Sequence, residues 1–209
     1  MASDGSARDT IPIDGAAVLV DIRKAQDGAY AREHALEGGG STIARPRFDV
    51  ALAEITAGRK VSHWIWYVWP SLSAVRDVMP AYRRFLLPDF EPTARAYLRD
   101  ATLATRLVAV TEAATAALAR GVPPSTLFGL KSHVYDAPKF AETMTCFAAA
   151  ARANGDAARE ACFVAGLRAF AASGDERLGD AVRRTAAAVR GLVARAAGAA
   201  ARGGGAGGA

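Results

Sequence analysis

The chain has 209 residues, of which 51% are hydrophobic and 22% charged, and its formal net charge is +5. A chain of this length can bury one sizeable apolar core, and its hydrophobic fraction is rich in alanine, the strongest helix former. No run reaches the ~18 consecutive apolar residues that a membrane-spanning helix needs, so the composition predicts one soluble all-α domain and argues against a membrane.

The positive charge is concentrated at the C-terminal end of the chain. From residue 183 onwards there are five arginines and no Asp or Glu, so this segment carries +5 and residues 1–182 sum to zero. Segments of like charge are usually solvated or disordered, and the uneven distribution argues against nucleic acid as a partner. The glycine-rich end predicts that residues 197–209 form a disordered tail.

Cysteine use and the first residues bear on the cellular compartment. Cys146 and Cys162 are too few for a disulfide framework or a Cys-rich zinc site. The opening sequence, MASDGSARDTIPIDG, has no basic segment followed by an apolar one, which a secretory signal would have. We therefore expect a cytoplasmic protein.

The predicted helical domain spans residues 17–196. Residues 1–16 mix small and polar residues without helical periodicity, so they are expected to be disordered. The run Gly38–Ser41 predicts a flexible insertion at about 31–47, before the main series of helices begins.

Apolar residues at helical spacing begin at Phe48, and Gly58 is placed to end that helix. The run WIWYVWP, residues 64–70, is apolar at consecutive positions and fits either a buried helix or a buried strand. Asp100 or Thr102 is expected to cap a long helix. The core face of that helix would consist of Leu103, Leu107, Val110, Ala114 and Leu118.

Further helices are predicted beyond the Pro123–Pro124 pair. Asp136 and Pro138 predict a helix start, and the runs Asn154–Asp156 and Gly174–Asp175 predict two breaks between helices. No strand alternation extends over several segments, so an antiparallel sheet has little support. The expected architecture is a single compact domain of about six or more helices.

Residues 58–70, GRKVSHWIWYVWP, resemble the hallmark GRK-x-SHW-x-W-x-x-x-P of a small bacterial family, the domain of unknown function 1810. Three further blocks agree in order: AQDGAY at 25–30, AYL at 96–98 with L-x-x-RL at 103–107, and LFG at 127–129 with D-x-x-K at 136–139 and MT-x-F at 144–147. The resemblance covers roughly residues 20–185. It implies an all-helical fold and no established activity. The calpastatin label that members often carry has no support in this sequence.

The chain departs from that family pattern at three places. Ser71 stands where the family usually has Gln after the motif proline, and Glu142 with Thr143 stands where it has a pair of serines. The insertion at about 31–47 is also unusual for the family. A site that uses that Gln or those serines would therefore differ in this protein.

The aromatic run admits two interpretations. Large aromatic side chains usually form the core of a domain, and this is the first interpretation of Trp64, Trp66 and Trp69. In the alternative, an indole near the surface beside Arg59 and Lys60 would stack on a planar anionic ligand such as a nucleotide.

Three polar residues are further candidates. His63 would act as a general base or a pH switch, although a structural histidine next to a capping Ser62 is the more common arrangement. Asp136 and Lys139, three residues apart at a helix start, fit either a helix cap with a surface charge or a functional pair.

Motifs of the common enzyme classes are absent from the sequence. There is no Walker loop, GxGxxG, GxSxG or HExxH, and the three histidines are far apart, so neither a cofactor nor a metal site is predicted. The leading hypothesis is a helical binding or interaction module with unknown partners and no catalysis of its own. The alternative is a small-molecule-binding protein or an enzyme that acts on a phosphate-bearing, nucleotide-like ligand through the GRKVSHWIW segment. Its candidate ligand contacts are Arg59, Lys60, His63, Trp64, Trp66, Asp136 and Lys139.

Overall fold

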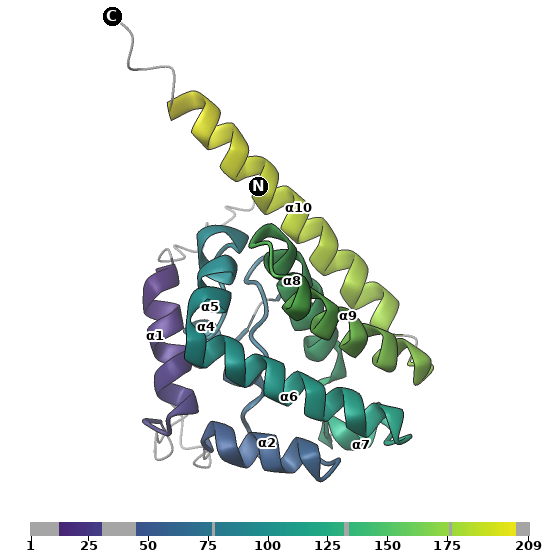
Figure 1. Cartoon of the computed structure of the whole chain (residues 1–209). Coiled ribbons are helices and arrows are strands. Elements are labelled where there is room, and N and C mark those ends of the chain that lie inside the picture. The colour runs from purple at the N-terminus through teal and green to yellow at the C-terminus, as the bar shows by residue number, and fades with distance from the viewer. Residues whose placement is uncertain (1–12, 31–44, 77, 132–133, 176, 204–209) are drawn as a thin grey trace, which may run out of the picture.

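The computed structural model describes residues 13–30, 45–76, 78–131, 134–175 and 177–203, which form an assembly of helices with one small hairpin (Figure 1). The longer helices are α1 (Gly15–Gln26), α2 (Phe48–Thr56), α6 (Ala101–Ala119), α8 (Ala137–Ala153), α9 (Ala157–Ala172) and α10 (Arg177–Gly203). The shorter helices are α3 (Ile65–Val68), α4 (Pro80–Arg83), η1 (Phe90–Ala94), α5 (Arg95–Arg99) and α7 (Pro124–Leu127). The antiparallel hairpin consists of β1 (Leu130–Lys131) and β2 (Val134–Tyr135). The predicted all-α fold is confirmed.

Helix α6 packs between α2 and α9 (Figure 1). Of the two predicted caps, Asp100 is the one used, because its side chain accepts hydrogen bonds from the backbone N–H groups of Thr102 and Leu103, both at 2.9 Å. The predicted core face is buried from Leu103 to Leu118. By length and composition alone α6 could cross a membrane, but nearly half of this stretch is buried inside the protein, as in the core helix of a helical domain.

Helix α8 packs on both α9 and α10 and carries several of the candidate residues. It ends where the sequence predicted a break, since Gly155 has a positive φ of 73°, a conformation that glycine adopts without strain. Asp156 then caps α9 by accepting a hydrogen bond from the Arg159 N–H at 3.0 Å.

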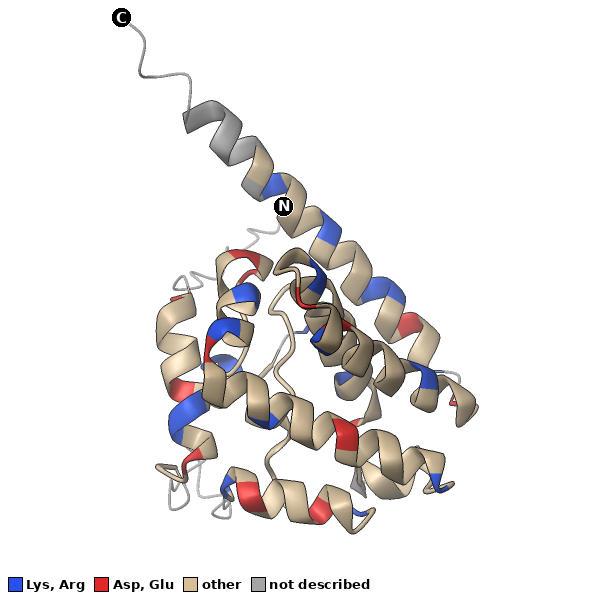
Figure 2. Cartoon of the chain, viewed as in Figure 1, with Lys and Arg blue, Asp and Glu red and all other residues tan. Residues whose placement is uncertain are grey.

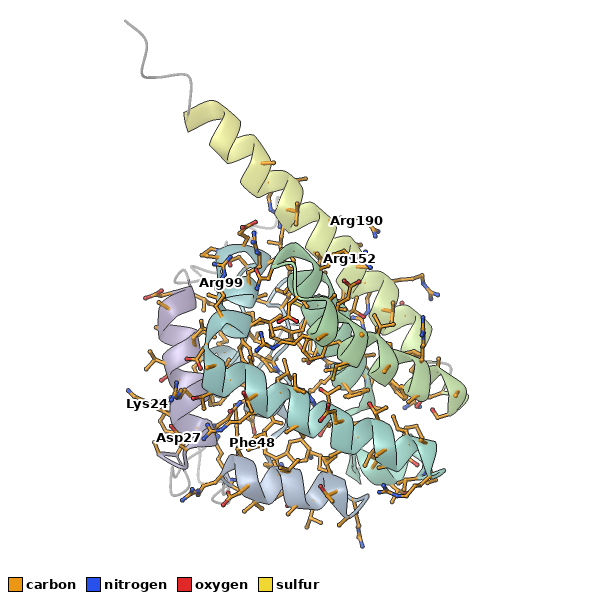
Figure 3. All side chains as sticks on the ribbon, viewed as in Figure 1. Lys24, Asp27, Phe48, Arg99, Arg152 and Arg190 are labelled. Carbon is orange, nitrogen blue, oxygen red and sulfur yellow. The ribbon has the colours of Figure 1, made fainter. Side chains whose placement is uncertain are left out.

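The tryptophan run lies in the middle of the core. Only Ile65–Val68 are helical, so the run is a single helical turn between two irregular segments and not a strand or a long helix. The Trp69 ring lies 5.5 Å from Trp64, 5.4 Å from Phe128 and 4.9 Å from Phe140, measured between ring centroids. Side chains such as these fill the space between the helices (Figure 3).

Helix α1 begins inside the stretch that the sequence predicted to be disordered. It begins at Gly15, where the Asp14 side chain accepts a hydrogen bond from the Ala16 N–H at 2.9 Å. This cap and the buried apolar face of α1 set the boundary, which periodicity alone had placed later. Residues 1–12 and most of the predicted insertion at about 31–47 lie outside the described residues.

Helix α10 continues to Gly203, so the predicted disordered tail is helical from its start at residue 197. Ala181, Thr185 and Val189 are buried against the body of the protein, and beyond them the helix projects outward (Figure 1). The high helix propensity of the alanine-rich sequence outweighs its scattered glycines, which explains this correction. Arginines lie along the helix as blue bands (Figure 2).

Candidate functional site

The loop from Gly58 to Trp64 is held by the carboxylate of Glu54, near the end of α2. This carboxylate accepts hydrogen bonds from the Val61 N–H and the Trp64 indole Nε1, both at 2.7 Å. Ser62 donates to it through its backbone N–H and its hydroxyl. Burial raises the pKa of Glu54, but these hydrogen bonds outweigh burial and leave the pKa below its usual value. Ser62 therefore anchors the loop on Glu54 and is not the helix cap that the sequence suggested.

The same loop brings Lys60 to a buried charge cluster, which consists of Lys60, Asp136 and Lys139. The Asp136 carboxylate lies 3.0 Å from the Lys60 Nζ and 2.6 Å from the Lys139 Nζ. All three side chains are at most 7% exposed. The alternative of a helix cap with a surface charge is wrong, because Lys139 is buried and the Asp136 side chain makes no capping hydrogen bond.

The Trp66 indole, on α3, contacts this cluster. The Lys139 Nζ lies 3.4 Å from the centroid of the indole, a close cation–π contact, and the Tyr82 ring stacks on the indole at 5.1 Å. An ammonium this close occupies one face of the ring, so Tyr82 takes the other face. Trp64 is fully buried, with the Lys60 Nζ 5.6 Å from its centroid. A ligand at this site would therefore meet the edge of Trp66, since neither indole has an open face.

The surroundings of Lys139 lower the pKa of its ammonium from the ordinary 10.5 to about 8. Burial is the largest cause, because it penalises the charged form. The Asp136 carboxylate opposes this effect, whereas the positive charges of Arg76 and Lys60 add to it. At neutral pH the lysine is mostly charged, and only a small rise in pH is needed for it to begin losing its proton.

This pKa predicts that Lys139 makes stability depend on pH. Below about pH 8 the lysine is charged in the folded and unfolded states, so the cost of burying the charge is fully present. Between pH 8 and 10.5 the folded state loses the proton first, so stability rises with pH. The unfolding free energy of the wild type relative to Lys139→Met should rise by about 3 kcal/mol across this window, measured by urea unfolding. A pH-independent difference would contradict the prediction.

A second polar group, the Glu142 centre, consists of Ser71, Arg76, Glu142 and Arg184. Glu142 lies on α8, one turn after Lys139, and its side chain is 1% exposed. Its Oε2 accepts hydrogen bonds from the Ser71 hydroxyl at 2.9 Å and from the Arg76 Nε at 2.6 Å. Ser71 and Glu142 are both positions where this chain departs from the family pattern, and the structure shows that the two side chains contact each other.

The predicted ligand contacts separate into a set at the buried charge cluster and an exposed set. The set gathered at the buried charge cluster is Lys60, Trp64, Trp66, Asp136 and Lys139. Arg59 and His63 are exposed. Sequence reasoning missed the roles of Glu54 and Glu142, because helical periodicity marks apolar faces and a carboxylate interrupts such a face. It also missed Arg76, which lies outside the helices and has no local pattern. The departure at Glu142 was the one signal that pointed to it.

An open hollow of about 300 Å³ lies elsewhere, between α6 and α9. It is lined by Thr105, Val108, Glu112, Ala158, Arg159 and Cys162.

Burial, with the charge of Glu112 adding to it, raises the pKa of the Cys162 thiol to about 11, so this thiol is not an activated nucleophile. Burial raises the pKa of Cys146 to about 12, with the same consequence. In the part of the chain that the structure describes, no three His, Cys, Asp or Glu side chains are grouped to hold a metal ion.

The fold and the site define an all-α protein with a buried lysine–aspartate cluster behind a tryptophan-bearing segment. Residues 41–177, more than half of the chain, match the family described as "Protein of unknown function (DUF1810)", and the protein belongs to this family. The crystal structure of the conserved hypothetical protein Rv1873 from Mycobacterium tuberculosis is similar, with 28% identity and a TM-score of 0.55 over 78% of this chain and 94% of that one. No protein with a curated description matches the chain. These findings confirm the resemblance seen in the sequence, and they assign no activity.

Proposed function

We propose that the protein binds a small anionic, phosphate-bearing ligand beside the buried charge cluster. The observation that carries this proposal is the position of Lys139, whose side chain is 2% exposed, paired with Asp136 and placed against the Trp66 ring. Strongly perturbed titratable groups of this kind are concentrated at functional sites. The surroundings of Lys139 therefore favour a protein that binds a phosphate-bearing small molecule over a simple interaction module.

The buried charge cluster is not expected to make the fold more stable than apolar side chains in the same place would. Moving an ammonium or a carboxylate out of water costs several kcal/mol, and a buried ion pair is often no more stabilising than apolar side chains of the same size. Here two lysines and one aspartate are buried together. Folding stability therefore does not explain why these charges are buried, whereas ligand binding would.

The balance of charge favours an anion over a cation. Lys60 and Lys139 share the single carboxylate of Asp136. In the Glu142 centre, Arg76 and Arg184 both pair with one carboxylate. Because Arg184 also pairs with Asp180 on α10, one positive charge is in excess, and lysine and arginine are the side chains that bind phosphate.

An enzyme that acts on the same ligand is a second candidate, favoured by the pKa of Lys139. A group with a pKa of about 8 can donate or accept a proton near neutral pH, as a general acid or base does. The interaction-module hypothesis, by contrast, gives the buried charges no role.

Thermal-shift titration tests the proposal. Pyrophosphate, nucleotides and sugar phosphates are added to the wild type at pH 7, because a ligand that binds only the folded state raises its Tm. We expect at least one of these anions to raise the Tm of the wild type. The same anion should have no effect on Lys139→Met, in which a neutral side chain of similar length keeps the apolar contact with Trp66.

Lys24→Met is the matched control, since Lys24 is exposed on α1 (Figure 3) and its loss should leave the response unchanged. Arg59→Ala and His63→Ala test the two exposed candidates, and both variants should fold normally. The proposal fails if no anion shifts the wild type, or if Lys24→Met loses the response as fully as Lys139→Met.

A further inference from the structure

We infer that Glu142 accepts a hydrogen bond from a hydroxyl group of the ligand, so that the ligand is a phosphorylated sugar or another phosphorylated polyol. The inference rests on the proposed function, because it places the hydroxyl next to the proposed phosphate site. The Glu142 centre then recognises the uncharged part of the ligand, next to the phosphate.

One oxygen of Glu142 lacks a hydrogen-bond donor. The side chain is 1% exposed, and both known donors, the Ser71 hydroxyl and the Arg76 Nε, bind Oε2. Oε1 is buried without a hydrogen-bond partner. A cationic nitrogen of Arg184 lies 3.6 Å from it, which is too far for a hydrogen bond. A buried carboxylate oxygen without a donor is unfavourable, so a donor from a ligand would bind well there.

The charges around Glu142 select the kind of donor. A phosphate oxygen cannot bind Oε1, because two acceptors of like charge repel each other. An ammonium group would meet the positive charges of Arg76 and Arg184, which already pair with this carboxylate. A neutral hydroxyl supplies the missing donor without adding charge, and it is the group that sugars and polyols carry next to phosphate.

The geometry of α8 places this acceptor beside the proposed phosphate site. Lys139 and Glu142 are three residues apart on α8, and residues at this spacing lie on the same side of a helix. Arg76 joins the two groups, since it binds Glu142 and its charge also lowers the pKa of Lys139. The two groups therefore lie within the span of one small ligand, with its phosphate at the cations and a hydroxyl at Glu142.

Arg184 gives the ligand a way to reach Oε1. Its side chain is 49% exposed, and its Nε lies 2.9 Å from the Asp180 Oδ2 on the same helix, α10. Turning Arg184 toward a phosphate would break no hydrogen bond to Glu142, and the phosphate charge would replace the ion pair with Asp180 that the turn gives up. Such a movement would expose Oε1 to the ligand hydroxyl.

Two of the departures from the family pattern, at Ser71 and Glu142, fall at this place in the structure. Ser71 and Glu142 replace the Gln and the serine of that pattern, and here they are hydrogen-bonded to each other. The Glu142 centre is therefore expected to set which ligand this protein takes, while the buried charge cluster binds the phosphate common to such ligands.

Isothermal titration with matched probes tests the inference. Glycerol 3-phosphate, ribose 5-phosphate and glucose 6-phosphate carry hydroxyls, whereas methyl phosphate has the same charged group and none. We expect at least one of the three to bind the wild type about tenfold more tightly than methyl phosphate, the size expected for a hydrogen bond to a carboxylate. Glu142→Gln keeps the shape of the side chain but weakens the acceptor, so the ratio of polyol phosphate affinity to methyl phosphate affinity should fall toward one. The ratio is taken within the variant, because the loss of a negative charge beside Arg76 and Arg184 also changes the affinity for methyl phosphate itself.

Each outcome decides a different point. If methyl phosphate binds the wild type as tightly as the three polyol phosphates, the hydroxyl site is wrong and the proposed phosphate site stands. If Glu142→Gln keeps the full preference, the hydroxyl binds elsewhere and the inference is also wrong. If none of the four probes binds but another anion raises the Tm of the wild type in the thermal-shift titration, the hydroxyl site is wrong and the proposed phosphate site stands. If no anion binds in either experiment, the proposed function fails, and the hydroxyl site fails with it. The comparison within the wild type needs no variant, so it decides even if Glu142→Gln does not fold.

Discussion

Replacing Trp69 with alanine should lower the free energy of unfolding by about 3 to 5 kcal/mol, because the indole is fully buried and the cavity left behind would fill only in part. The ring contacts Trp64, Phe128 and Phe140 at centroid distances of 4.9 to 5.5 Å, and so connects the tryptophan run to α7 and α8. A loss of this size is a large part of the stability of an ordinary domain. Urea unfolding followed by circular dichroism would measure it.

Two further substitutions test the origin of that loss. Trp66→Ala should cost less than Trp69→Ala, since Trp66 is only partly buried. Trp69→Phe keeps most of the ring contacts and removes the indole Nε1, which is buried without a hydrogen-bond partner, so it should also cost less. If Trp69→Ala proves as stable as Trp66→Ala, the core is not organised around Trp69.

The long helices could be predicted from the sequence because signals close to their ends define them. Asp100 caps α6, and Gly155 with Asp156 separates α8 from α9, through contacts within a few residues of each boundary. The tryptophan run could not be assigned in this way, since consecutive apolar residues have no period. Its conformation depends on contacts of Trp69 with residues far along the chain, such as Phe140.

The candidate site was predictable to a similar extent. The candidate ligand contacts predicted from the sequence include both Lys60 and Asp136, and the structure joins them at 3.0 Å although they are far apart in sequence. The sequence could not show which of the polar candidates are buried. Lys139 looks like a surface lysine at a helix start, and only the packing of α3 and α8 places it against Trp66. The role of Glu54 was hidden for the same reason, because its donors come from the loop that follows α2.

Replacing Asp136 with asparagine should lower the free energy of unfolding by about 3 to 5 kcal/mol at pH 7, the usual result of removing one partner from a buried ion pair. The change leaves two buried ammonium groups, of Lys60 and Lys139, without their shared counter-charge. Asp27→Asn is the matched control, since Asp27 lies at the surface (Figure 3) and pairs with Arg106 at 2.7 Å. An exposed pair of this kind contributes about 1 kcal/mol or less.

The pH dependence of this loss identifies its cause. The Asp136 carboxylate raises the pKa of Lys139, so without it the folded-state pKa falls below about 8 and the variant releases the proton at lower pH than the wild type. The destabilisation should therefore shrink as the pH rises toward 8, and be larger near pH 6 than near pH 9, when urea unfolding is measured at both.

Adding Lys139→Met to Asp136→Asn should restore part of the stability at pH 6, because it removes one of the two uncompensated charges. If Asp136→Asn is as stable as the wild type at both pH values, the two lysines are not charged together in the folded protein, and the excess positive charge on which the proposed anion site depends is absent.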